Sequence, residues 1–195
     1  MKSLKLIILI LICSLPFFYL TGLFLQDKLG ANPVDTLEGF TGSWVIYFLL
    51  ITLLVPYLRQ VFAIKWFLPE HLIKRTFGLA AFGYAILHLG IYFVFDMAFS
   101  IKDTFIDIIE RPFILVGMLS FILLIPLAIT SSIKWQRKLK KHWKTLHKLI
   151  YPIILLGITH GIMVQKVDYQ EPLIYLSLFI LILVLKTLNQ KKTSR

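Results

Sequence analysis

Long apolar runs alternate with short polar segments along the whole chain. Each run is close to the about 20 residues that a helix needs to cross the hydrocarbon core of a bilayer. A helix satisfies its own backbone hydrogen bonds in lipid, and there is no alternation of period two that would indicate a β-barrel. The sequence therefore predicts an all-α integral membrane bundle of six transmembrane helices. The predicted spans are 6–25, 43–57 (extending towards Phe62), 77–95, 112–130, 146–164 and 172–185, the second and sixth being the shortest.

The first span has a rival interpretation as a signal peptide, because Lys2 and Lys5 precede it. The run is long, however, and no small-x-small cleavage site follows it, so we expect an uncleaved helix. Composition agrees with membrane insertion. The chain is 58% hydrophobic and 16% charged, with a mean hydropathy of +0.81. A soluble domain is nearer half apolar and a quarter charged.

The net charge of +11 is unevenly distributed. The N-terminus, segments 59–76 and 132–148 and the C-terminus hold 17 of the 21 Lys and Arg residues and only one acid, Glu70. Segments 26–42, 96–111 and 165–171 hold the other nine acids. The positive-inside rule then predicts that both termini are cytoplasmic. The charge is thus explained by topology and by attraction to membrane lipid, and no nucleic-acid motif accompanies it.

The basic segment 132–148 carries Trp135 and Trp143 between its lysines. It is typical of an interfacial amphipathic segment, and it also suits a docking surface or a cradle for haem propionates. No repeat or linker divides the chain, so we expect one domain, 1–195. The single cysteine, Cys13, excludes an internal disulfide, and the absence of C-x-x-C-H excludes covalent c-type haem.

Among the five histidines, His88 and His160 lie well inside predicted spans. An ionisable residue within a membrane span raises a functional hypothesis by default, and neutral imidazole is a ligand of haem iron. A rise of about 1.5 Å per residue places His88 roughly 16 Å and His160 roughly 20 Å from the cytoplasmic side. The two side chains are therefore predicted to clamp one iron. His147, at the boundary, would serve a second site or an alternative arrangement with His88.

Two observations leave alternatives open. The thirteen steps from His147 to His160 leave them about 140° apart on a straight helix, although Pro152 between them permits rephasing. Each histidine alone also fits an interhelical hydrogen bond. The small residues Gly83, Gly90, Gly157 and Gly161 either open space for a flat macrocycle or serve ordinary helix packing, which is the commoner role.

Four stretches resemble the MsrQ family (formerly YedZ), which belongs to the ferric-reductase-like transmembrane superfamily. They are GANPVDTLEGFTGSW (30–44), KRTFGLAAFGYAILHLGIY (74–92), IIERPFILVG (108–117) and TSSIKWQRKLKKHWKTLHKLIY (130–151). The resemblance covers nearly the whole chain, with a ferric-reductase-like core at about 43–164.

The resemblance implies a multi-pass b-type cytochrome of the bacterial inner membrane, which passes electrons from the quinone pool to a periplasmic molybdopterin-containing methionine-sulfoxide reductase subunit that repairs oxidised proteins. The family's haem-iron ligands fall on His88, His147 and His160. The family also implies FMN, for which no residues are assigned. Where the superfamily has a second histidine on the third span, this chain has Arg75 or Ile101. One or two haems b are therefore expected.

The resemblance makes the chain an electron-transfer subunit rather than a catalytic one, so whether it is itself an enzyme stays open. Two rival functions remain. One is a stand-alone transmembrane ferric reductase, and the other is a non-redox membrane protein whose histidines pack or bind a metal such as zinc.

Overall fold

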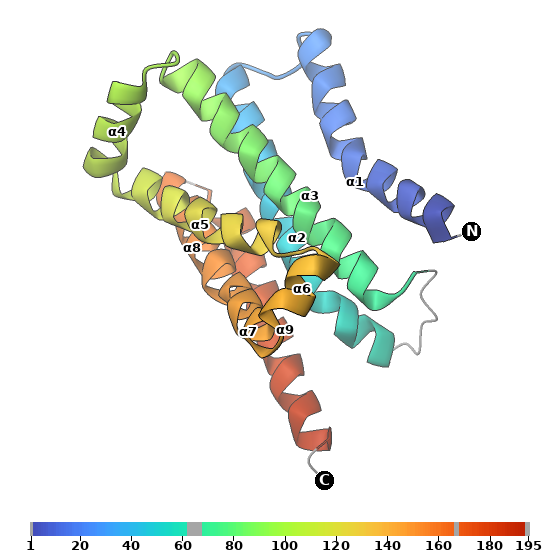
Figure 1. Cartoon of the computed structure of the whole chain (residues 1–195). Coiled ribbons are helices and arrows are strands. Elements are labelled where there is room, and N and C mark those ends of the chain that lie inside the picture. The colour runs from blue at the N-terminus through green and yellow to red at the C-terminus, as the bar shows by residue number, and fades with distance from the viewer. Residues whose placement is uncertain (1, 62–67, 166–167, 194–195) are drawn as a thin grey trace.

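The computed structural model describes residues 2–61, 68–165 and 168–193, and all regular structure in these ranges is helical (Figure 1). The elements are α1 (Lys2–Leu25), α2 (Pro33–Val61), α3 (Glu70–Ile91), the π-helical turn η1 (Tyr92–Asp96), α4 (Ile101–Glu110), α5 (Pro112–Ile129), α6 (Ile133–Leu139), α7 (Lys141–Leu146), the 3-10 turn η2 (His147–Leu149), α8 (Ile150–Val164) and α9 (Gln170–Thr193).

Six helical segments of the described chain are long and apolar enough to cross a membrane, which confirms the predicted number of spans. They are Ser3–Leu25, Pro33–Leu58, Glu70–Asp96, Pro112–Ile129, Lys141–Val164 and Gln170–Asn189. The expectation that the second and sixth are short is wrong, because α2 starts at Pro33 and α9 runs to Thr193. The extension of the second span towards Phe62 lies outside the described residues.

The early start of α2 has a local cause. Proline suits the first turn of a helix, where its missing N–H has no partner to lose. The side-chain oxygen of Asn32 accepts a hydrogen bond of 3.5 Å from the backbone N–H of Asp35, as an N-cap does. Asp35 also lies in the first turn, where a negative charge is favourable. Residues 33–42 therefore extend the helix instead of forming a loop.

The two ends of the bundle differ in charge. Both termini lie on the side of the molecule opposite α4, as an even number of spans requires (Figure 1). We call the end with the termini, α6 and α7 the basic end. The end with α4 and the start of α9 is called the acidic end.

The core of the bundle is built mainly from α2 against α3 and from α5 against α8. Leu49, Ile154 and Ile158 are among the most deeply buried side chains. One close approach depends on a glycine, because a Cβ on Gly157 of α8 would lie 2.7 Å from Ile46 Cδ1 of α2. Among the glycines that the sequence nominates for cofactor space, Gly157 therefore serves helix packing.

Helix α1 is attached to the bundle through the hydroxyl of Tyr84 on α3. This hydroxyl accepts a hydrogen bond of 2.8 Å from the backbone N–H of Phe17 and donates one of 3.1 Å to the carbonyl of Cys13. Phe17 and Cys13 are an i, i+4 pair of the same helix, next to Pro16. The tyrosine hydroxyl thus bridges a position of the α1 hydrogen-bond ladder.

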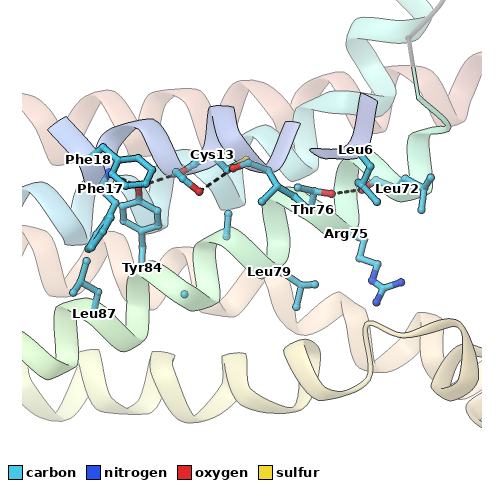
Figure 2. A pocket seen from close by; sticks show the side chains of 14 residues that line it. Leu6, Cys13, Phe17, Phe18, Leu72, Arg75, Thr76, Leu79, Tyr84 and Leu87 are labelled. Atoms are coloured by element: carbon cyan, nitrogen blue, oxygen red, sulfur yellow. Dashed lines mark hydrogen bonds between the residues drawn. The ribbon is translucent and has the colours of Figure 1, made fainter. Parts of the chain in front are cut away.

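An apolar groove of about 660 Å³ runs along this contact between α1 and α3 (Figure 2). Phe17 and Phe18 from α1 and Leu79 and Leu87 from α3 line it, and the guanidinium of Arg75 points away from α1. The Tyr84 hydroxyl at its end is already bonded to α1. The groove is therefore an apolar surface of the kind that lipid chains contact.

Candidate functional site

The side chains of His88 and His160 meet inside the bundle, nearer its acidic end than its basic end. Their ring centroids are 6.1 Å apart, with ring planes at 84°. His88 comes from α3 and His160 from α8, two helices that alternate with α2 and α5 around this point. The structure thus brings together the two histidines whose depth along the chain suggested a pair.

The ring of His88 is oriented by α2. Its Nδ1 lies 3.0 Å from the carbonyl oxygen of Glu38 and 3.3 Å from the hydroxyl of Thr41. The Thr41 hydroxyl donates its own proton to the carbonyl of Leu37, at 2.7 Å. Both atoms near Nδ1 are therefore acceptors, so Nδ1 carries the proton and donates it.

The ring of His160 is oriented in the same way by α5. Its Nδ1 lies 2.7 Å from the carbonyl oxygen of Phe113, which can only accept. In the described structure, Nε2 of neither ring has a hydrogen-bond partner. Each imidazole therefore keeps its Nε2 lone pair available, with its tautomer set by a main-chain carbonyl, as in metal-ligating histidines.

Two glycines give these rings their space, and neither was nominated from the sequence. A Cβ on Gly42 of α2 would lie 3.3 Å from Cε1 of His88. A Cβ on Gly117 of α5 would lie 2.9 Å from Nδ1 of His160. Each imidazole thus packs against a helix backbone at a distance that no other residue type permits without movement.

The separation of the two rings suits a pair of imidazoles that would share one iron ion. With a metal–nitrogen bond of about 2 Å on each side, two imidazoles sharing one ion have ring centres on the order of 6 Å apart. In the part of the chain that the structure describes, no three His, Cys, Asp or Glu side chains group as ligands of a bare ion. The donor set on offer is thus two neutral nitrogens, which suits haem, whose macrocycle supplies the other ligands.

His147 lies in a different setting, in η2 at the basic end. Its Nδ1 is 3.1 Å from the carbonyl of Trp143, one turn earlier, and its ring stacks on the Trp143 ring with centroids 3.9 Å apart. The Trp143 indole N–H donates to the carbonyl of Thr130 at the end of α5, at 2.8 Å. His147 is thus held by its own turn and also by a hydrogen bond to the backbone of Leu127 on α5, while His71 and His142 are exposed.

The phase between His147 and His160 is changed by η2 rather than by a kink at Pro152. Pro152 is the third residue of α8, where proline is tolerated. The three residues of η2 turn about 120° each instead of about 100°, which reduces the offset from roughly 140° to roughly 80°. The two side chains therefore still point to different places.

Glu38, whose carbonyl bonds His88, also brings a carboxyl group into the bundle from a position that the sequence assigned to a loop. Because α2 starts at Pro33, Glu38 is part of a span. Its carboxyl group lies beside Asp96, and its Oε1 is buried without a hydrogen-bond partner among the described residues. The early helix start is the signal that would have revealed this residue, through the Asn-Pro pair at 32–33.

Two polar clusters connect helices at the acidic end of the bundle. Neither cluster was predicted from the sequence. In the first, Asp107 of α4 accepts hydrogen bonds from the Arg111 guanidinium and, at 2.6 Å, from the Tyr92 hydroxyl of η1. Hydrogen bonding to Arg111 holds the pKa of Asp107 below its usual range. This cluster ties α4 to the turn that follows His88.

In the second cluster, one oxygen of Glu171 on α9 accepts hydrogen bonds from three hydroxyls. Ser43 donates at 3.0 Å, Tyr47 at 3.4 Å, and Tyr175 also donates. The rings of Tyr47 and Tyr175 pack edge to face, with centroids 5.1 Å apart. These contacts hold the start of α9 against α2, at the acidic end of the bundle.

Comparison with known proteins identifies similar chains. A family described as the ferric reductase like transmembrane component matches residues 41–158. The chain is 39% identical over 175 residues (88% of this chain, 79% of the relative) to the protein-methionine-sulfoxide reductase heme-binding subunit MsrQ of Herminiimonas arsenicoxydans. It is 41% identical over 172 residues (87% and 78%) to the protein of the same name from Xanthomonas euvesicatoria pv. vesicatoria.

The family match, the identity over most of both chains and the six apolar helices make this a multi-pass membrane protein. The chain belongs to the MsrQ family, within the ferric-reductase-like transmembrane proteins.

Proposed function

We propose that this chain is the b-type cytochrome subunit of a methionine-sulfoxide reductase system, in which His88 and His160 would hold haem b. The observation that carries the proposal is the facing pair of imidazoles, each with Nδ1 bonded to a main-chain carbonyl and Nε2 left without a partner. The name of the relatives, a heme-binding subunit, supports it.

The role of the protein chain is to hold the two imidazoles in place and to orient them for haem binding. Glu38 and Phe113 accept the Nδ1 protons through their carbonyls and thereby fix the tautomer of both imidazoles. Gly42 and Gly117 let the rings rest against α2 and α5. A bound haem supplies one-electron redox chemistry there, at a potential that ligand identity, second-shell hydrogen bonds and burial determine.

The direction of electron flow follows from the resemblance and from charge. We infer that electrons enter from the quinone pool and leave to a soluble periplasmic molybdopterin-containing subunit, across the bacterial inner membrane. The concentration of Lys and Arg at the basic end supports cytoplasmic termini. The acidic end then faces the periplasm and the catalytic subunit, so this chain transfers electrons and does not itself reduce the sulfoxide.

His147 is proposed as half of a second haem site near the basic end. Its Nδ1 is bonded to the carbonyl of Trp143, as the Nδ1 atoms of the pair are bonded to main-chain carbonyls, and it also contacts the backbone of Leu127 on α5. The cationic side chains of α6 and α7 suit propionates. The total is then two haems, or one if the His147 site stays empty. The FMN expected from the resemblance has no assigned residues.

The haem-to-protein ratio of purified protein tests the main proposal. With haem available during expression, we expect a b-type spectrum whose bands shift to the red on reduction. His88→Ala removes one Nε2 ligand and should cost most of the bound haem at the pair. His71→Ala is the matched control, since His71 is an exposed residue of the same helix. A colourless wild-type preparation would refute the proposal.

A stand-alone transmembrane metal reductase is the second candidate, favoured by the description of the matching family as ferric reductase like. The His88–His160 pair serves it equally well. The two functions separate when the purified, reduced chain is mixed with ferric chelate alone. Rapid reoxidation without any soluble partner favours the metal reductase, and stable reduced haem favours the subunit.

A further inference from the structure

Helix α4 exposes a row of large apolar side chains at the acidic end. Ile101, Phe105 and Ile109 are 66%, 65% and 79% exposed, although they recur every four residues as the buried face of a helix would. No residue of α4 is fully buried. The helix therefore presents an apolar face outside the bundle, and something in its surroundings has to cover it.

Most residues of α4 fall on three faces when each step is taken as about 100°, and Lys102 and Ile106 lie between the apolar and the acidic faces. Thr104, Asp107 and Ile108 are partly buried and mark the side that faces the bundle. The apolar row lies roughly 110° to one side of this bundle face, and the acids Asp103 and Glu110 lie roughly 100° to the other side. The apolar and acidic faces are thus roughly 150° apart.

The rotation of α4 about its axis is fixed by specific contacts. Asp107 accepts a hydrogen bond from Tyr92 of η1, which holds this side of α4 against the bundle, while Arg111 and the Ser100 hydroxyl secure the two ends of the helix itself. The apolar face therefore cannot turn inward to join the core.

The position of α4 identifies what covers this face. It connects the end of one span, at Asp96, to the start of the next, at Pro112, so both of its ends are at the membrane boundary. Figure 1 shows it lying across that end of the bundle, outside α3 and α5. A helix at the rim of a bundle in an interface has one side to protein, one to water and one to lipid.

We propose that α4 lies in the plane of the membrane interface, with Ile101, Phe105 and Ile109 inserted among the acyl chains and Asp103 and Glu110 in water. A soluble protein is a poorer occupant, because a partner approaching from water meets the acidic face, on the opposite side. The proposal rests on the membrane-spanning bundle and not on the cofactor.

Single cysteines test this placement in the full-length chain. The only native thiol, Cys13, is 5% exposed, so the unmodified chain serves as the labelling blank. Asp103→Cys, Phe105→Cys and Ile109→Cys are labelled with a bimane fluorophore and reconstituted into vesicles of phosphatidylethanolamine and phosphatidylglycerol. Quenching is measured with doxyl-labelled lipid and with aqueous iodide.

We expect doxyl lipid to quench Phe105→Cys and Ile109→Cys about twofold or more strongly than Asp103→Cys, with the order reversed for iodide. Two positions one turn apart keep the test valid if one variant misfolds. Iodide quenching of all three variants to the same extent would place the apolar face in water. It would then be free for a soluble protein, and the proposal would be overturned.

Discussion

The pair His88–His160 and the lone His147 have Nδ1 hydrogen-bond partners at different distances along the chain. The Nδ1 partners of the pair lie 50 and 47 residues away, on other helices. The partner of His147 lies four residues away, on the preceding turn. The pair is thus oriented only when α2 and α5 pack, whereas His147 is oriented by its own turn together with contacts to the far end of α5, at Leu127 and Thr130. Changes near Glu38 and Phe113 should therefore disturb the pair and spare His147.

Replacing the histidines themselves should give the largest difference between the pair and His147. His160→Ala should abolish the low-spin signal of bis-imidazole iron, because one axial nitrogen is lost. His147→Ala should leave that signal unchanged and remove only a second haem, if one is present. Electron paramagnetic resonance and haem content measure both. Equal loss in the two variants would contradict the assignment of separate sites.

Crowding a glycine should produce the next largest effect. Gly117→Ala places a methyl group 2.9 Å from Nδ1 of His160, and such overpacking costs about 1–3 kcal/mol of unfolding free energy. Gly42→Ala meets His88 at 3.3 Å and should cost less. Gly78→Ala is the control, because nothing lies near its Cβ and helical glycines gain about 0.5–1 kcal/mol on this change.

Denaturation in detergent measures the three glycine variants. The spectrum of His147-bound haem, where present, should not change in any of them. A Gly117→Ala protein as stable as Gly78→Ala would show that His160 moves freely.

A smaller, local effect is expected at His147 from Trp143→Phe. The change keeps an aromatic ring against His147 but removes the indole N–H that reaches Thr130, at a cost of about 1 kcal/mol. Hydrogen exchange of η2 should rise, while the signal of the His88–His160 pair stays constant. Trp135→Phe is the matched control. If the pair responded as strongly as η2, the two settings would not be independent.

The smallest effect concerns pH at the acidic end. Because Arg111 depresses the pKa of Asp107 in the folded protein, the ion pair stabilises the fold above the unfolded pKa of about 3.9. That stabilisation is lost only as the pH falls through the depressed value. Hydrogen-exchange protection of α4, at matched exchange rates, should therefore be constant from about pH 5 to 8.

Asp107→Asn provides the comparison at pH 7, where it should lower protection of α4 and of Tyr92 beside His88, and not of η2. Loss of protection near pH 6 in the wild type would show that a different group controls α4.

The six spans and the His88–His160 contact are predictable because they depend on quantities that sequence carries. Apolar length gives the spans, and rise per residue gives the depth of each histidine. The start of α2 at Pro33 was not predicted from the sequence, because the acids Asp35 and Glu38 indicate a loop. Asn32 and Pro33 are nevertheless residues that mark a helix start. α4 also carries a signal, in Ser100 followed by apolar residues four apart.

The close contacts around the rings are not predictable in the same way. Gly42 and Gly117 resemble the other helical glycines until α2 and α5 are placed beside the histidines. The partners of Nδ1 are main-chain carbonyls, which every residue has. Only the packing of the bundle decides which carbonyl is used.

The hydroxyl of Tyr84 has a consequence for the order in which the bundle assembles. Phe17 and Cys13 are placed to bond each other while α1 is alone in the bilayer, and the hydroxyl comes between them only when α3 arrives. We therefore expect α1 to enter the membrane as an ordinary helix and to acquire its final shape by exchanging one backbone bond for two tyrosine bonds. The final shape of α1 would then be determined by its docking against α3 and not by the sequence of the first span alone.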